Sequence, residues 1–345
     1  MITALAHLVR RGLAITCCLL VSLALTPVVA AHGVAPVPSS WADVLLAWSI
    51  EPHVILPLLA AWLVYRMAVR RVNAAHPRNP VPRFRSWAWN GGLLVLAVAL
   101  CSPIATYDTT LFSVHMVQHI LLTLVAAPLL ALGAPITLLL RLSSPRTRQK
   151  VILPVLHSWP MRVISFPVVT WVLFAATMWA SHFSGLYDAA LDNELVHIVE
   201  HGIYLFVGLL FWWPVVGADP SPWRMPHAAR VGYLFLGMPQ SSFLALAIIS
   251  APAVLYPHYD TLVRTWGPTP LDDQVLAGGI MWVVGDAIFL IAMILAIWVW
   301  LRAEEAEGHR VDAKLDREEA ARAAATSRPA APPTPRDSAF ESTDA

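Results

Sequence analysis

The chain has 345 residues, of which 57% are hydrophobic and only 13% are charged. The charged share is about half that of an ordinary soluble domain, and several apolar runs are long enough to span a bilayer. This composition excludes an ordinary soluble domain and predicts an all-α, polytopic membrane helix bundle surrounded by membrane lipid. The net charge of +1 gives no reason to expect a nucleic-acid partner, and the three cysteines have no CxxC spacing that would indicate a thiolate cluster.

Residues 1–31 are predicted to be a signal peptide or a first membrane span. Arg10 and Arg11 precede an apolar stretch at 12–25, and Val28-Val29-Ala30-Ala31 offers small residues for cleavage. Pro27 and these small residues favour cleavage. An uncleaved segment would instead add an eighth helix to the seven expected after it.

Continuous apolar runs predict seven transmembrane helices within a domain at residues 32–302. Helices are expected because a membrane span must satisfy its own backbone hydrogen bonds. The predicted spans are 52–69, 87–106, 112–140, 164–181, 195–216, 231–255 and 275–301. Residues 303–345 are charged at first and then rich in Ala, Pro, Ser and Thr, which predicts a cytoplasmic tail that ends in disorder.

The charge of the connections predicts the orientation of these spans, because cytoplasmic loops are enriched in Lys and Arg. The connections at 67–86 and 141–163 carry several basic residues and no acid. The alternate connections carry Asp108, then Asp188, Asp192 and Glu194, then Asp260, Asp272 and Asp273. We therefore expect a multi-pass protein of the bacterial inner membrane, with its mature N-terminus outside and its C-terminus in the cytoplasm.

Two histidine pairs lie in the outer halves of the third and fifth predicted spans. They are His115 with His119 and His197 with His201, and residues four apart share one face of a helix. Ionisable side chains inside a span are costly and mark functional sites by default. One alternative is that the histidines only form hydrogen bonds between helices. Because the topology puts both pairs at the same depth, we favour one shared metal site.

Other candidate groups lie at the same outer level. The weaker candidate ligands are His53, His182 and Met281. The acids that could orient ligating imidazoles are Asp108, Glu200 and Asp273, with a solvated boundary acid as the alternative for Asp108. Imidazoles with thioethers nearby suit copper better than magnesium or calcium, and zinc remains open.

The residues His197-x-x-Glu200-His201 also match the H-x-x-E-H pattern of one metallopeptidase group. That motif is short, and no part of the chain resembles the soluble catalytic domain of such peptidases. We therefore expect a protein that is not an enzyme.

Longer motifs surround the histidine pairs. They are Ser102-Pro103, the run at 111–119, Ala127-Pro128-Leu129-Leu130, Leu132-Gly133-Ala134-Pro135, Leu186-Tyr187-Asp188, Phe211-Trp212-Trp213-Pro214, Leu255-Tyr256-Pro257, the run at 270–274 and Gly278-Gly279-Ile280-Met281-Trp282. Together they resemble the CtaG family of multi-span cytochrome c oxidase assembly factors, of the kind linked to caa-type oxidases. The resemblance covers roughly residues 51–300.

This resemblance implies a role in maturing a haem-copper cytochrome c oxidase by copper supply or insertion. It implies the oxidase subunits as partners, together with an extracytoplasmic copper chaperone. A copper or other metal transporter and a metal-free membrane scaffold are the alternatives. A transporter needs polar groups toward the cytoplasm, but 120–132 and 203–211 are almost wholly apolar. The main polar exceptions in the later spans are Gln240, Ser241, Ser242 and Asp286.

Overall fold

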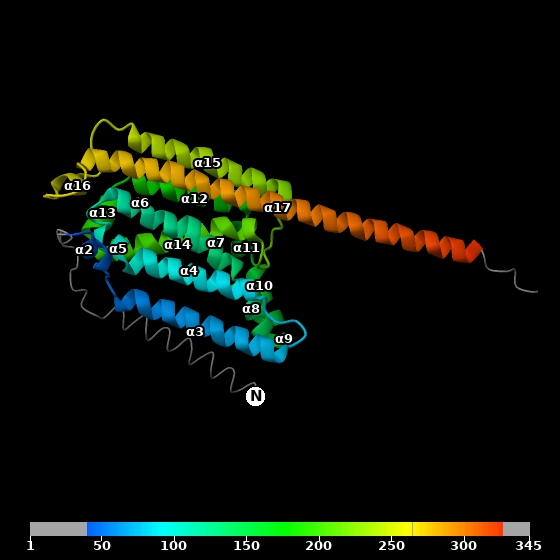
Figure 1. The fold of residues 1–345 in the computed structure, drawn as a ribbon. Coiled ribbons are helices and arrows are strands. Elements are labelled where there is room, and N and C mark those ends of the chain that lie inside the picture. Colours follow the sequence, from blue (N-terminus) through cyan, green and yellow to red (C-terminus); the bar gives the residue numbers. More distant parts are fainter. Residues whose placement is uncertain (1–39, 264, 327–345) are drawn as a thin grey trace, which may run out of the picture. The chain divides into compact units, whose positions relative to one another are not determined.

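The structure is a computed structural model that describes residues 40–263 and 265–326 (Figure 1). The predicted signal peptide or first span at 1–31 lies outside the described residues, and so do residues 327–345 of the predicted tail. The chain divides into two compact units, Met1–Ile294 and Leu295–Ala345.

Every regular element in the described part of the chain is a helix. The long helices are α3 (Pro52–Ala75), α4 (Arg83–Cys101), α12 (Pro167–His182), α14 (Glu194–Val216), α15 (His227–Ile249) and α17 (Pro270–Thr326). The third predicted span is divided into α6 (Phe112–Ile120), the π-helix η1 (Leu121–Ala126), α7 (Ala127–Leu132) and α8 (Pro135–Leu142). The short connecting helices are α2 (Trp41–Leu46), α5 (Pro103–Tyr107), α9 (Pro145–Thr147), the π-helix η2 (Arg148–Ile152), α10 (Leu153–Leu156), α11 (Trp159–Ile164), α13 (Leu186–Asp192) and α16 (Pro257–Thr261).

Among the described residues, 6 helical segments are long and apolar enough to cross a membrane. They are Pro52–Ala75, Arg83–Tyr107, Phe112–Leu142, Glu194–Val216, His227–Ile249 and Pro270–Arg322. The prediction of an all-α membrane protein is confirmed at this level. The fourth predicted span corresponds to α12, which has 16 residues. That is shorter than the ~20 residues of a typical span, so the count of seven stays a prediction.

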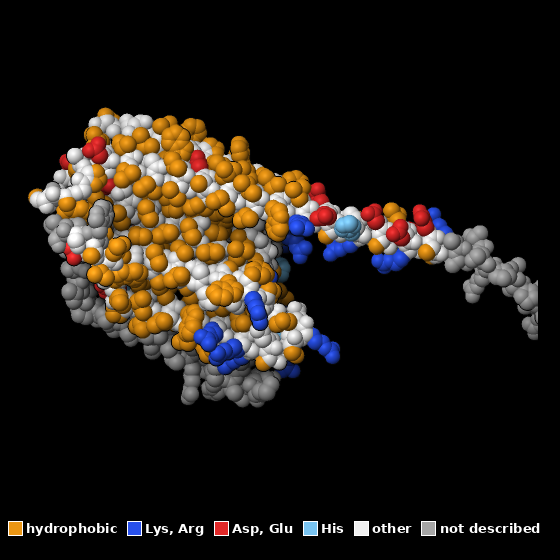
Figure 2. Space-filling model, in the orientation of Figure 1, with side chains coloured by type: hydrophobic (Ala, Val, Ile, Leu, Met, Phe, Trp, Pro, Cys, Tyr) orange, Lys and Arg blue, Asp and Glu red, His pale blue; other side chains and the backbone are white. Residues whose placement is uncertain are grey.

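The first unit is a bundle whose centre is the helix series α6–η1–α7. Helix α14 packs against η1 and α7 on one side, and α4 packs against the same two elements on another. Leucines of α4 and of η1 form a shared core that includes Leu93, Leu96 and Leu122. The outer face of this unit is covered with hydrophobic side chains, as a lipid-facing surface requires (Figure 2).

Helix α14 approaches η1 very closely at Gly208. A Cβ added at Gly208 would lie 3.1 Å from the Thr123 Cα and carbonyl oxygen and 3.1 Å from the Ala127 Cβ. Small residues let helix backbones approach in this way inside a membrane. The indole of Trp212 on the same helix donates a hydrogen bond to the carbonyl of Thr123 at 2.9 Å. Gly208 and Trp212 thus set the spacing between these two helices.

The π-helical turns of η1 begin at Leu121, two residues after His119, and two local features account for them. Pro128 has no N–H to donate to the carbonyl four residues earlier, and its ring crowds that carbonyl. The Thr123 hydroxyl donates to the carbonyl of His119 at 2.6 Å. Such π-turns occur frequently at functional sites.

In the second unit, the described residues are the C-terminal part of α17 and are mostly exposed. Ion pairs three or four residues apart line this stretch, namely Arg302–Glu305, Arg310–Glu307 and Lys314–Glu318. These pairs support the helix. The predicted tail therefore begins as a helix that reaches Thr326.

Substituting Gly208 tests the close approach of α14 to η1. We expect Gly208→Leu to lower the free energy of unfolding by ~1–3 kcal/mol, because the new side chain must push two backbones apart. Gly202 on the same helix is the matched control, since nothing lies within 4 Å of a Cβ built there. Gly202→Leu should be neutral or stabilising, because leucine is the better helix former. Thermal unfolding in detergent measures both, and equal midpoints for the two variants would contradict the packing argument.

Candidate metal centre

The structure places the rings of His115, His119, His197 and His201 together between α6 and α14. The ring centroids of His115 and His119 are 4.2 Å apart, and those of His197 and His201 are also 4.2 Å apart. Across the two helices, His115 lies 5.4 Å from His197 and His119 lies 6.0 Å from His201. The i, i+4 spacing puts each pair on one helix face, and the packing of α14 against η1 turns the two faces toward each other.

Side chains bind the first backbone N–H groups of both helices that carry the histidine pairs, α6 and α14. Asp273 is fully buried and accepts hydrogen bonds at the start of α6, from the backbone N–H of Phe112 at 2.7 Å and the hydroxyl of Ser113 at 2.5 Å. The side chain of Asn193 caps α14 by accepting from the N–H groups of Leu195 and Val196. Asp273, expected to orient an imidazole, therefore anchors the helix that carries His115 and His119.

Two buried carboxylates lie within reach of the imidazoles. Glu200 Oε2 is 3.8 Å from His115 Nε2 and 3.9 Å from His119 Nε2. Asp108 Oδ2 is 3.8 Å from His197 Nε2. Asp108 and Glu200 were predicted to orient the imidazoles rather than to bind a metal, but the structure places both carboxylates beside the ring nitrogens.

The potential ligand atoms form two overlapping groups. Asp108, His197 and His201 make one group, and His115, His197 and Glu200 make the other. Within each group the ligand atoms lie within 4.8 Å of one another, and His197 belongs to both. We call His197, His201 and His115, together with the neighbouring His119 and the acids Asp108 and Glu200, the histidine centre. Its geometry could hold one ion, or two ions that share His197.

Several buried polar atoms of the histidine centre have no hydrogen-bond partner. The Nε2 atoms of His115 and His119 lie 2.9 Å apart, so one donates a proton to the other. The Nδ1 atoms of both rings and Glu200 Oε2 are buried without a partner among the described residues. Unpaired buried polar groups cost about 1–3 kcal/mol each, so they call for a functional explanation. In neutral rings, the imidazole that donates through Nε2 keeps its lone pair on Nδ1, and a cation could bind that lone pair and the Glu200 oxygen.

Gln118 orients His201, and the sequence analysis did not single it out. Its Nε2 donates to the carbonyl of Ala99 at 3.0 Å, which leaves its Oε1 to accept from His201 Nε2 at 2.9 Å. The lone pair of neutral His201 is then on Nδ1. Gln118 is fully buried inside an apolar span, and that polar placement beside His119 was the available sequence signal.

Asp108 lies between the spans, in the turn before α6, and is buried. Burial raises the pKa of the Asp108 carboxyl to about 7, and hydrogen bonds from Gln118 and the Thr109 backbone oppose this shift. Burial disfavours the charged carboxylate, and a cation beside it would restore that form.

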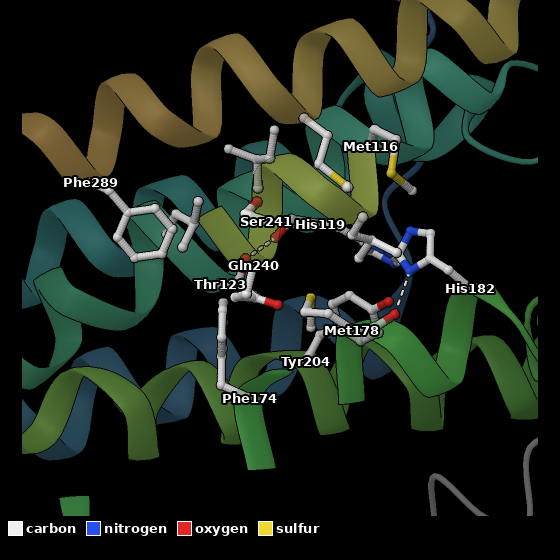
Figure 3. A pocket seen from close by; sticks show the side chains of 14 residues that line it. Met116, His119, Thr123, Phe174, Met178, His182, Tyr204, Gln240, Ser241 and Phe289 are labelled. Carbon is white, nitrogen blue, oxygen red and sulfur yellow. Dashed lines mark hydrogen bonds between the residues drawn. The ribbon is translucent and has the colours of Figure 1, made fainter. Parts of the chain in front are cut away.

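The weaker candidates lie outside the histidine centre. His53 is half-buried in the first turn of α3, a helix that carries none of the four imidazoles. His182 and Met281 line a neighbouring internal cavity together with His119 (Figure 3). Met116 and Met178, which were not proposed as ligands, line the same cavity.

Comparison with known proteins places this chain in a family. Residues 63–303, more than half of the chain, match the family described as cytochrome c oxidase caa3 assembly factor (Caa3_CtaG). Uncharacterized proteins of Mycobacterium bovis and Mycobacterium tuberculosis are each 29% identical over 290 residues, which cover 81% of this chain and 43% of those proteins. A Mycobacterium leprae protein is also 29% identical and is covered to 43%. The chain thus spans less than half the length of these relatives, and no solved structure matches it. The predicted family is confirmed: this chain is a membrane protein that belongs to the cytochrome c oxidase caa3 assembly factors.

Proposed function

We propose that this protein binds copper at the histidine centre and supplies it to a caa3-type oxidase during assembly. The observation that carries the proposal is the convergence of four imidazoles and two buried carboxylates, with buried polar atoms of His115, His119 and Glu200 left without a hydrogen-bond partner among the described residues. Imidazole and carboxylate donors suit Cu(II) and also Zn(II). The family membership favours copper, because the client is a haem-copper oxidase.

A role in supply rather than catalysis agrees with the surroundings of the centre. Copper is the cargo in this proposal, so the centre must release it as well as bind it. Potential ligand atoms up to 4.8 Å apart have to move inward to coordinate one ion. A loosely set ligand group of this kind suits transient binding. The partners in this proposal are the oxidase subunits and an extracytoplasmic copper chaperone.

We also propose seven spans, with the histidine centre at the outer side of the membrane and the C-terminus in the cytoplasm. Exposed basic side chains support this orientation. They gather at the end of the first unit that holds the α3–α4 connection and α9, opposite the end that holds α5 and α13 (Figure 2). Cytoplasmic loops are the ones enriched in Lys and Arg. Copper arriving from outside the cytoplasm would meet the centre first.

Replacing the first histidine pair tests the metal role in cells. We expect His115→Ala/His119→Ala to insert normally, because apolar residues ease membrane insertion. The variant should nevertheless leave oxidase activity at the level of a deletion strain when external copper is low. Oxidase activity and the copper content of purified oxidase measure the effect.

The matched control is His76→Ala/His157→Ala, which changes two exposed histidines far along the chain from the centre. This control should restore the oxidase fully. If the His115/His119 variant also restores it at low copper, the metal-free scaffold takes the place of copper supply. If cellular copper uptake collapses and the oxidase recovers when cytoplasmic copper is raised, the transporter alternative is correct.

Cysteine labelling tests the orientation. In a variant whose native cysteines are replaced, Ser184→Cys before α13 should react with an impermeant thiol reagent in intact cells. Arg78→Cys in the α3–α4 connection should react only after the cells are opened. Both positions are exposed, so access across the membrane decides the result. The reverse pattern would overturn the proposed topology.

A further inference from the structure

A second group of potential ligands lines the internal cavity next to the histidine centre. The cavity has a volume of about 40 Å³. A water molecule needs ~10–15 Å³ by this measure, so the space also admits a metal ion. Its donor side chains come from three helices and are Met116, His119, Met178, His182 and Met281. We call this the methionine cavity, and Figure 3 shows Met116, His119, Met178 and His182 around it.

His182 presents a free lone pair to the methionine cavity. Its Nδ1 lies 2.7 Å from the carbonyl oxygen of Met178, which can only accept, so Nδ1 carries the proton. The lone pair of the neutral ring is then on Nε2. His182 is 4% exposed, and its Nε2 is buried with no hydrogen-bond partner in the part of the chain that the structure describes. The fold has therefore fixed the tautomer that a metal ligand needs and left the ligating atom open.

His119 belongs to both sites. Its Nε2 faces His115 in the histidine centre, and the ring also lines the methionine cavity. The His119 Nδ1 is buried without a hydrogen-bond partner among the described residues, and the ring packs against Tyr204 at a centroid distance of 3.9 Å with the planes tilted by 33°. One imidazole thus joins the two groups of ligands.

The donors of the two sites differ in charge and softness. The histidine centre contains Asp108 and Glu200, whereas the described residues that line the methionine cavity include no Asp, Glu, Lys or Arg. Thioether sulfur selects Cu(I) over harder cations. A single positive charge also costs less to bury among neutral ligands than a double one.

We propose that the methionine cavity is a second metal site, which binds Cu(I) or another soft monovalent cation through Met116, Met178, Met281 and His182. This inference deepens the proposed function, because it adds a site that holds copper in the monovalent state next to the histidine centre. His119 would connect the two sites. No change of oxidation state is assigned to the protein.

Metal titration of the purified full-length protein in detergent tests this proposal, with Ag(I) as the redox-inert probe of a Cu(I) site and Zn(II) as the probe of the histidine centre. We expect Met178→Leu/Met281→Leu to weaken Ag(I) binding by more than ~10-fold, because loss of a group that merely orients a metal ligand already costs about that much. The same variant should leave Zn(II) binding unchanged. We expect His197→Ala/His201→Ala to lose Zn(II) and keep Ag(I). Leucine nearly conserves the volume of methionine, so the double Met variant should fold.

Met225→Leu is the matched control, because Met225 is buried and does not line the cavity. It should bind both ions as the wild type does. If Met178→Leu/Met281→Leu binds Ag(I) as tightly as the wild type does, the proposal of a second site is wrong and the proposed function is unaffected. If the wild type binds Ag(I) but neither Zn(II) nor Cu(II), the proposed function of the histidine centre is wrong and the second site in the methionine cavity is supported.

X-ray absorption of bound Cu(I) gives a readout that does not depend on the Met variants. In a chain with Cys17, Cys18 and Cys101 replaced by Ala, sulfur neighbours of the copper can only be methionines. Sulfur in the coordination sphere supports the methionine cavity. A sphere of nitrogen and oxygen alone contradicts it.

Discussion

The close approach of α14 to the α6–η1–α7 series is the constraint on which the site depends. Gly208 has no side chain where Thr123 and Ala127 lie, and Trp212 ties the helices with a hydrogen bond to the Thr123 carbonyl. This contact holds His115 5.4 Å from His197. A wider spacing would leave two separate histidine pairs, each of which could only form hydrogen bonds as polar groups between helices do. The metal-competent geometry is therefore a consequence of backbone packing one to three turns away from the histidines.

Several buried polar atoms without hydrogen-bond partners lie around the same place. His115 and His119 Nδ1, Glu200 Oε2 and His182 Nε2 all lack hydrogen-bond partners among the described residues. Native proteins pair the large majority of their buried polar atoms, so a cluster of exceptions marks a place where a local rule is broken for function. Other hydrogen bonds at this place are satisfied. Gln118 holds His201 in a defined tautomer, and the Met178 carbonyl does the same for His182.

The two proposed sites divide the donors by chemical type. Carboxylates accompany the imidazoles in the histidine centre, which suits a divalent ion, and thioethers accompany them in the methionine cavity, which suits a monovalent one. His119 is common to both. Polar groups continue beyond the cavity, where Ser242 donates to Asp286 at 2.8 Å.

The sequence alone determined the class of protein, its family and the two histidine pairs, because these follow from local patterns: long apolar runs, conspicuous motifs and a spacing of four residues on one helix face. Only the tertiary structure decided what those groups meet. Asp273 caps α6, Glu200 and Asp108 lie beside the ring nitrogens, and α12 is shorter than its apolar run. Met116, one position from His115 and turned about 100° away from it, faces a cavity with methionines from two other helices. Local spacing fixes which side of a helix a residue occupies, whereas its partners depend on contacts between segments far apart in the chain, and these arise from packing that no local pattern records.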